Sequence, residues 1–386
     1  MKKSFFTYLG IGEIGHLELL FAVSPILSGY SLLGLPLSFV VWFLVLILSF
    51  IKHNNKQIFR PLLFLLVYVA LHDILLVIGV GKNFNGYLNT LLYLLSIIYL
   101  SRSLNLNKLR GAINIVSIVL IVGLLYQYSM ILTTGGVHPL EIPGLQMPQD
   151  RFDTFSLRPS SFFMEPAVYA EYMFMPISLS LLDRRYLWAG LLMFFVLLTG
   201  STTGFITVFL LIIVYVLTQG VSFKYTFVLF SIGTILIYLL LNSTIFEVGL
   251  EKMEGTNFDT NIRINQGIII DSYMSLDEYI FGVACAGPYE FTKLHSISDI
   301  KITEGNAVFM PTFWYILLCF GIIGLFLYLR VYWIIAKRCR QCIPLVIVVI
   351  SLLFTNGISM SVEYVYLTSF MLVLYYNFKN EVAYTK

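Results

Sequence analysis

Apolar runs recur along the whole chain, and only short polar stretches separate most of them. A helix needs about 20 mostly apolar residues to cross the hydrocarbon core of a bilayer. The pattern therefore predicts an all-α fold, a polytopic membrane helix bundle of about twelve transmembrane helices. We place the spans near residues 17–32, 35–51, 61–80, 86–101, 111–133, 164–182, 186–200, 203–218, 225–245, 306–333, 343–358 and 361–378. No polar block is large enough for a separate globule, so residues 1–386 are expected to form a single integral membrane domain.

The composition agrees with a bilayer as the solvent. Hydrophobic residues make up 58% of the chain and charged residues only 12%, whereas about a quarter of the residues of a soluble chain are charged. Four cysteines are too few and too scattered for a disulfide framework. Cys339 and Cys342 have no second pair to complete a zinc site, so the sequence indicates no metal site.

The positive charges indicate the orientation of the chain, because basic residues accumulate in short loops on the cytoplasmic side of a membrane. A cytoplasmic N-terminus places on that side Lys2, Lys3, Lys52, Lys56, Arg60, Arg102, Lys108, Arg110, Arg184, Arg185, Lys224, Lys337, Arg338, Arg340, Lys379 and Lys386. Both termini are then cytoplasmic. Two net-acidic segments, about 134–163 and 246–305, become extracytoplasmic loops, where we expect any site to lie.

The first long loop ends in a cation and two carboxylates at a membrane boundary. Arg158 precedes the span near 164–182, and Glu165 and Glu171 lie at the mouth of that span or within it. An ionisable group in an apolar helix is costly and normally faces a cavity or a partner. These residues therefore indicate either a site at the outer mouth or a salt bridge that fixes the loop to the helix.

In the second long loop, residues 261–273 predict a short helix along the membrane surface. One face of this helix would carry Ile262, Gln266, Ile269 and Tyr273. Arg263 would lie near the lipid headgroups, where a guanidinium can bind phosphate oxygens through two parallel hydrogen bonds. A solvated arginine is the alternative. Glu304 and Asn306 stand where the span near 306–333 begins.

Two ionisable residues, His72 and Asp73, interrupt the span near 61–80, and Glu363 lies near the outer end of the last span. Adjacent positions on a helix point about 100° apart, so we expect that His72 and Asp73 do not both serve one site. One of the two can simply bond a neighbouring helix.

Several classes of chemistry lack their motifs. The chain has no Gly-rich phosphate loop with Lys-Ser/Thr, no His-Glu-x-x-His, no Gly-x-Ser-x-Gly and no paired aspartates to hold a metal for a nucleotide-sugar. Soluble energy-rich donors are therefore disfavoured. Nucleic acid is disfavoured as well, because the basic residues follow the topology rather than form a patch. The lack of an internal repeat argues against an inverted-repeat transporter.

Four segments, in this order, resemble the polysaccharide polymerase and O-antigen ligase superfamily, and most closely the Wzy-type repeat-unit polymerases. They are residues 158–170 (Arg-Pro-Ser-Ser-Phe-Phe-Met-Glu-Pro-Ala-Val-Tyr-Ala), 198–204, 261–263 with 281–287, and 305–309 running into 320–325. Family members often have an arginine where this chain has the run Ser-Thr-Thr at 201–203, and a histidine where it has Gly305. The missing histidine disfavours a ligase, because the ligases depend on a histidine at that junction.

The resemblance implies a membrane-embedded, GT-C-like glycosyltransferase in a bacterial inner membrane. Its substrates would be undecaprenyl-diphosphate-linked glycans, joined on the extracytoplasmic face into O-antigen or capsule. No cofactor is implied, because the lipid diphosphate is already an activated leaving group. The lipid bilayer, a flippase and a chain-length regulator are the implied partners, without nucleic acid. An O-antigen ligase-like glycan transferase and a membrane transporter or flippase remain the alternative functions.

The same resemblance divides the candidate residues by task. Arg158 and Arg263 would hold and neutralise the departing diphosphate. A base must take a proton from the acceptor hydroxyl, and Glu165 is the first choice, with His295 or Glu304 as alternatives. Substrate binding and orientation would fall to Tyr169, His295, Glu304 and Asn306.

Overall fold

The computed structural model of the protein describes residues 12–32, 35–52, 58–80, 84–145, 158–219, 262–284, 287–297, 310–355 and 361–378. The span expected near 225–245 lies outside these ranges. The longer described helices are α3 (Leu37–Ile51), α4 (Arg60–Val80), α5 (Phe84–Ser103), α6 (Leu106–Thr134), α7 (Pro166–Leu182), α8 (Tyr186–Leu198), α9 (Thr202–Gln219), α15 (Thr312–Arg338), α16 (Ile343–Thr355) and α17 (Val362–Phe378). The shorter elements are α2 (His16–Val23), η1 (Ile26–Gly29), β1 (Ser31–Leu32), β2 (Leu35–Pro36), α12 (Ile262–Tyr273), α13 (Leu276–Phe281), α14 (Gly287–Leu294) and η4 (Arg340–Cys342).

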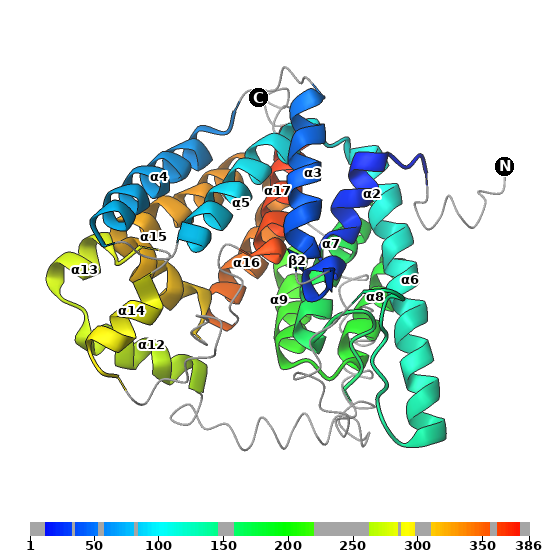
Figure 1. Ribbon diagram of the computed structural model, residues 1–386. Coiled ribbons are helices and arrows are strands. Elements are labelled where there is room, and N and C mark those ends of the chain that lie inside the picture. Colours follow the sequence, from blue (N-terminus) through cyan, green and yellow to red (C-terminus); the bar gives the residue numbers. More distant parts are fainter. Residues whose placement is uncertain are drawn as a thin grey trace.

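The long helices form one bundle, and successive helices run between its two ends (Figure 1). Contacts between distant segments identify one end. An ion pair joins Arg110 to Asp183 over 3.0 Å, and the Gln219 amide donates to the Arg340 carbonyl over 3.0 Å. The helix ends that meet there carry Lys52, Arg60, Arg102, Lys108, Arg110, Arg184, Arg185, Lys337, Arg338 and Arg340. We call this the basic end, and the opposite end, with residues 135–145 and 158–165, the loop end.

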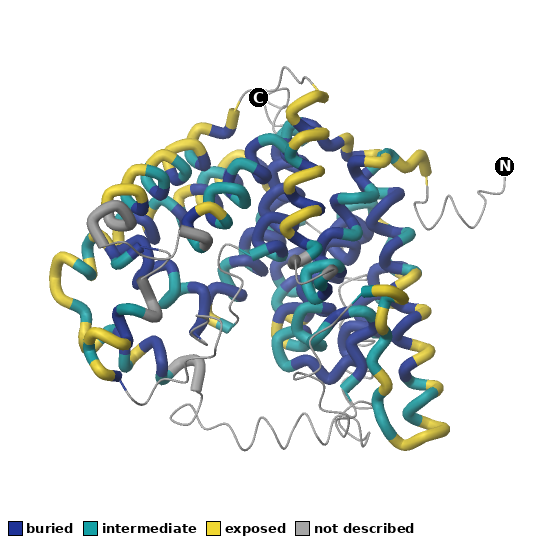
Figure 2. The backbone as a smooth tube through the Cα atoms, viewed as in Figure 1, coloured by how far each residue is buried: buried dark blue, intermediate teal, exposed yellow. Residues whose placement is uncertain are grey.

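The outside of the bundle is apolar where a lipid-facing surface is expected. Figure 2 shows burial along α7 and α17 and exposure along α3, α4 and α6. Exposed on these outer helices are Phe39, Phe43, Phe50, Phe64, Leu75, Val122 and Leu132. Within the described ranges, α6, α9 and α15 are long and apolar enough to cross a membrane, and α3, α8 and α16 are shorter apolar helices. The all-helical membrane architecture is thus supported, while the number of about twelve spans stays a prediction.

The predicted span near 17–32 is wrong. Helix α2 has 8 residues, which is about 12 Å of helix and too short to cross a bilayer. It ends because Pro25 follows, and the Ser24 hydroxyl donates to the Phe21 carbonyl over 2.7 Å. The one-turn η1 and the β1–β2 hairpin then return the chain to α3, with Ser31 opposite Pro36.

The helix predicted near 306–333 begins later, at Thr312, because Pro311 occupies its N-cap, and it continues to Arg338. Gly321 breaks this helix internally with φ of 63° and ψ of −172°. The break leaves backbone groups of α15 available to another segment.

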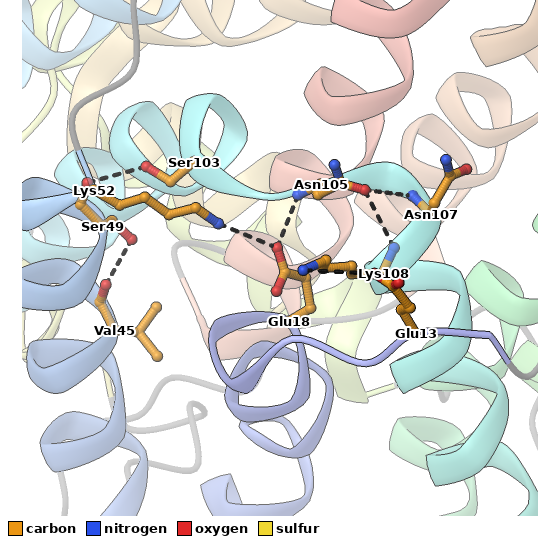
Figure 3. A network of polar contacts seen from close by, with 9 residues as sticks. All are labelled: Glu13, Glu18, Val45, Ser49, Lys52, Ser103, Asn105, Asn107 and Lys108. Atoms are coloured by element: carbon orange, nitrogen blue, oxygen red, sulfur yellow. Dashed lines mark hydrogen bonds and ion pairs between the residues drawn. The ribbon is translucent and has the colours of Figure 1, made fainter.

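A buried carboxylate ties the short α2 to its neighbours at the basic end (Figure 3). Glu18 is 1% exposed; it accepts a hydrogen bond from the Asn105 backbone N–H at 2.9 Å and pairs with Lys52 at 3.6 Å. Asn105 caps α6 by accepting from the backbone of Lys108 at 3.3 Å. Glu18 therefore links α2, the end of α3 and the start of α6.

We expect Glu18→Ala to lower the stability of the protein by about 2 kcal/mol, because a hydrogen bond to a charged buried group is lost and the Asn105 N–H is left unpaired. The matched control is Glu13→Ala, since Glu13 is 86% exposed and pairs with Lys108 only at 3.8 Å. The measurement is the melting temperature of each detergent-solubilised variant. Equal melting temperatures for the two variants would contradict the proposed link.

Candidate functional site

The segment 158–165 is held in place by an amide from α6. Gln127 Oε1 accepts hydrogen bonds from the backbone N–H groups of Ser160 at 3.0 Å and Ser161 at 2.7 Å. Its Nε2 donates to the His138 carbonyl at 3.0 Å, on the other side of the first long loop. Ser161 has φ of 56°, so the chain turns sharply beneath this amide. Gln127 thus connects both described ends of the loop to the bundle.

A tyrosine from the α2–α3 connection adds a second attachment. The Tyr30 hydroxyl is within hydrogen-bond distance of two carbonyl oxygens as a donor, that of Leu140 at 3.0 Å and that of Phe162 at 3.2 Å. A Cβ on Gly29 would meet the Met164 side chain at 2.7 Å, so backbone and side chain already touch there. The contacts of Tyr30 with Phe162 and of Gly29 with Met164 fix residues 158–165 against the loop end of the bundle.

Arg158 reaches the turn between α8 and α9. Its Nη2 donates to the Gly200 carbonyl at 3.4 Å, and Gly200 takes φ of 63°. The same turn is fastened by the Tyr128 hydroxyl, which donates to the Leu198 carbonyl. The segments 158–170 and 198–204, which are far apart in the sequence, are therefore neighbours in space.

The guanidinium of Arg158 lies in a partly buried, charged environment. Burial lowers the pKa of Arg158 from its ordinary value, and the charge of Glu165 opposes that effect. Arginine stays protonated under such shifts because its pKa begins above about 12. Its Nε is buried and has no hydrogen-bond partner within the described part of the chain. The group is thus a fixed cation with an unused donor, which suits the binding of an anion.

Glu165 is the N-cap of α7, followed by Pro166 at the first helical position. The helix N-terminus favours a negative charge there. The Glu165 carbonyl accepts from the Tyr169 N–H at 3.3 Å. Tyr169 itself is 0% exposed, and its ring is roughly perpendicular to that of Phe163, with 6.1 Å between the ring centroids. Its hydroxyl has no hydrogen-bond partner among the described residues. The structure therefore places Glu165 and Tyr169 one turn apart at the start of α7, with the charge of Glu165 acting on Arg158, and the predicted roles of the three residues stay predictions.

Residues 281–284, which belong to the family-like segment 281–287, bond to α15 where that helix is broken. The N–H groups of Val283 and Ala284 donate to the carbonyls of Leu318 at 2.8 Å and Cys319 at 2.9 Å. A Cβ on Gly321 would come within 2.2 Å of the Ile280 carbonyl oxygen, so no side chain fits between the two backbones. The segment 281–284 thus replaces helical partners that the break in α15 leaves unpaired.

Helix α4 contributes polar groups to this junction. The Tyr68 hydroxyl donates to the Phe320 carbonyl at 2.8 Å, and the Tyr68 ring stacks on His72 at 5.3 Å. His72 Nδ1 lies 3.1 Å from Asp73 Oδ1, with the Asp73 side chain fully buried. The two side chains thus bend toward each other from adjacent positions, although their Cβ directions differ by about 100°, and whether they serve one site stays a prediction.

Helix α12 exists as predicted, and its position along the membrane surface stays a prediction; the residues that it buries do not follow the face expected to carry Ile262, Gln266, Ile269 and Tyr273. Gln266 and Ile270 are each 2% exposed, whereas Tyr273 is 46% exposed. The helix packs on α15 through this face, which is rotated toward Ile270. Arg263 lies in its first turn, but its side chain is outside the described residues, as are Glu304 and Asn306 entirely.

His295 follows α14, and α12 and α14 both pack on α15. Its surroundings differ from those of Arg158, which lies with α6 to α9. Figure 1 draws α12 and α14 on the opposite side of the bundle from α6 and α8. The described residues do not bring His295 and Arg158 together. Within the described ranges no group of three His, Cys, Asp or Glu side chains could hold a metal ion.

The residues that position the site were not singled out in the sequence. Gln127 offered a signal, because a lone amide in the apolar span near 111–133 needs hydrogen-bond partners. Tyr30, Tyr68 and Tyr128 offered none, since the chain has 25 tyrosines and most belong at interfaces or in packing.

We expect Gln127→Leu to reduce strongly the polymerase activity that the resemblance implies, while the protein still inserts in the membrane, because the hydrogen bonds that hold residues 158–165 are lost. The length distribution of the surface glycan, run on a gel, measures this. Ser129→Ala is the control on the same helix, since Ser129 bonds only its own helix, at the Tyr126 carbonyl. A normal ladder from Gln127→Leu would show that the segment needs no such anchor.

These features define a class: a helical membrane protein whose polar, charge-bearing segments are packed onto the ends and breaks of apolar helices. The sequence model of the WcaD colanic acid polymerase family matches residues 145–376, more than half of the chain. The chain belongs to the WcaD colanic acid polymerase family, so it is a membrane protein of polysaccharide repeat-unit polymerisation, with glycosyltransferase-type activity. No curated protein matches the chain. The predicted polymerase family is thus confirmed, and a finer Wzy-type subtype stays a prediction.

Proposed function

We propose that the protein polymerises undecaprenyl-diphosphate-linked oligosaccharide repeat units into O-antigen or capsule on the extracytoplasmic face of the bacterial inner membrane. The observation that carries the proposal is Arg158, a partly buried cation with an unused donor, held at the loop end beside Glu165. Membership of the polymerase family supplies the type of reaction. The basic end would face the cytoplasm, with both termini, and the loop end would face outward.

The reaction transfers the growing glycan from its lipid diphosphate to a hydroxyl of a new lipid-linked unit. The bond between the anomeric carbon and the diphosphate oxygen breaks, a glycosidic bond to the acceptor oxygen forms, and undecaprenyl diphosphate leaves. Arg158 stabilises the charge that develops on the leaving diphosphate, with Arg263 as a second cation. Glu165 accepts the proton of the acceptor hydroxyl, with His295 or Glu304 as alternative bases.

Two further residues would orient the sugars. Asn306 offers an amide near the start of α15, and Tyr169 offers a buried hydroxyl that needs a partner. The chemistry requires neither a nucleotide nor a metal, because the donor lipid is already activated. The bilayer delivers both substrates, and a flippase and a chain-length regulator would act before and alongside the enzyme.

The deciding experiment compares surface glycan from cells with the gene deleted and then restored. Collapse of the ladder to a single repeat unit attached to its acceptor supports a polymerase. Full-length chains that accumulate on the lipid carrier would indicate a ligase instead. An unchanged ladder would contradict the proposal and favour a transporter.

A further inference from the structure

Gln266 carries a polar group that the fold does not satisfy. Its side chain is 2% exposed, and neither its Nε2 nor its Oε1 has a hydrogen-bond partner within the described part of the chain. Burying an amide without partners costs about 1–3 kcal/mol, so proteins seldom do it without a use. The neighbouring backbone packs tightly against α15, because a Cβ on Gly267 would meet the Trp314 indole at 2.2 Å.

A second unsatisfied group lies beside the C-terminal end of the same helix α12. His295 Nε2 is buried without a partner among the described residues, and its ring lies 4.5 Å from Phe291 and 5.8 Å from Tyr273 between ring centroids. Asp271 Oδ1 is likewise buried without a partner within the described part of the chain. Helix α12 supplies Gln266 and Asp271, and His295 directly follows α14; both helices pack on α15, and Ile270, Phe291 and Leu318 belong to the apolar cluster between them.

The chemistry of Gln266, Asp271 and His295 indicates a neutral, hydroxyl-rich ligand. An amide supplies a donor and an acceptor, a carboxylate supplies an acceptor, and an imidazole supplies either. Aromatic rings beside such groups suit the apolar C–H face of a sugar ring. An anionic group fits less well, because Asp271 would repel it and the one cation among the described side chains of α12 to α14, Lys293, is exposed.

We propose that α12, α14 and the N-terminal end of α15 form a saccharide-binding subsite, in which Gln266 and His295 hold a sugar of the acceptor repeat unit. The subsite rests on the proposed function for the identity of the sugar, but the unsatisfied groups stand independently of it. The subsite is separate from Arg158, so the first proposed cation for the diphosphate and the acceptor sugar lie on different elements, whereas Arg263, the second proposed cation, lies on α12 itself.

The test is calorimetric titration of the detergent-purified protein with free repeat-unit oligosaccharide, released by mild acid from the host's own glycan. Wild type binds saturably, and Gln266→Leu, which keeps the volume but removes the amide, weakens binding about 10-fold or more. Gln219→Leu is the matched control and binds as wild type, because that amide lies at the basic end and already bonds the Arg340 carbonyl. His295→Phe, which keeps an aromatic ring, also weakens binding.

Wild-type affinity in Gln266→Leu, with a raised melting temperature, would overturn the subsite, since the amide would then be only an unpaired core group. Loss of binding in every variant, Gln219→Leu included, would overturn it too. Failure of the proposed function is seen separately, in the glycan ladder of the gene deletion. A ladder that collapses on deletion but is normal with Gln266→Leu would refute the subsite and leave the polymerase in place.

Discussion

Arg158→Ala is expected to abolish polymerisation, so that cells show single repeat units instead of a ladder. Arg158 is the described cation held beside Glu165 at the loop end, and its guanidinium would stabilise the charge of the departing diphosphate. The loss of such a preorganised donor typically lowers the rate about 100-fold or more. Gel analysis of surface glycan measures the outcome, with immunoblotting of membranes to show that the variant is inserted.

Two more variants separate charge from structure. Arg158→Lys keeps the positive charge but loses the planar fork, so we expect it to restore only part of the ladder. Arg338→Ala removes an exposed arginine at the basic end and should leave the ladder unchanged. Wild-type glycan lengths in Arg158→Ala, with normal membrane levels, would remove Arg158 from the site.

Much of the fold could be predicted because the bilayer imposes a simple rule on the chain. Apolar runs had to be helices, and the predicted spans near 111–133 and 361–378 agree with α6 and α17 to within a few residues. The exception near 17–32 shows the limit of that rule. Hydropathy averages across Ser24 and Pro25, whereas the backbone ends its helix there.

The candidate site was predicted in part, because charge in an apolar context is visible without coordinates. Arg158 and Glu165 stand out on that ground, and in the structure the charge of Glu165 raises the pKa of Arg158 against the effect of burial. The pairing of segment 281–284 with the break in α15 could not be predicted, because backbone hydrogen bonds between distant segments leave no residue-type signal. His72 and Asp73 show the same limit, since helical geometry gives the direction of Cβ but not the bend of the side chain.

Gly321→Ala is expected to be the most destabilising single change at the α13–α15 junction. Gly321 takes φ of 63° with ψ of −172°, a region essentially confined to glycine, which costs a residue with a Cβ about 1–3 kcal/mol. The added Cβ would also lie 2.2 Å from the Ile280 carbonyl oxygen and 2.6 Å from the Phe281 carbonyl carbon, so backbone rather than side chain must shift. Overpacking of this kind adds about 1–3 kcal/mol, and the segment 281–284 should leave the break in α15.

The melting temperature of the detergent-solubilised Gly321→Ala protein should fall by about 5 °C or more. Gly282→Ala should behave alike, because Gly282 has φ of 84° and its Cβ would lie 2.5 Å from the backbone of Cys319. Gly190→Ala in α8 is the control, since a Cβ there meets nothing within 4 Å and alanine favours the helix. If Gly321→Ala and Gly190→Ala melt at the same temperature, the close approach of α13 to the broken helix is not part of the folded protein. A shifted melt with a collapsed ladder would instead show that polymerisation depends on this junction, although Gly321 has no side chain that could touch a substrate.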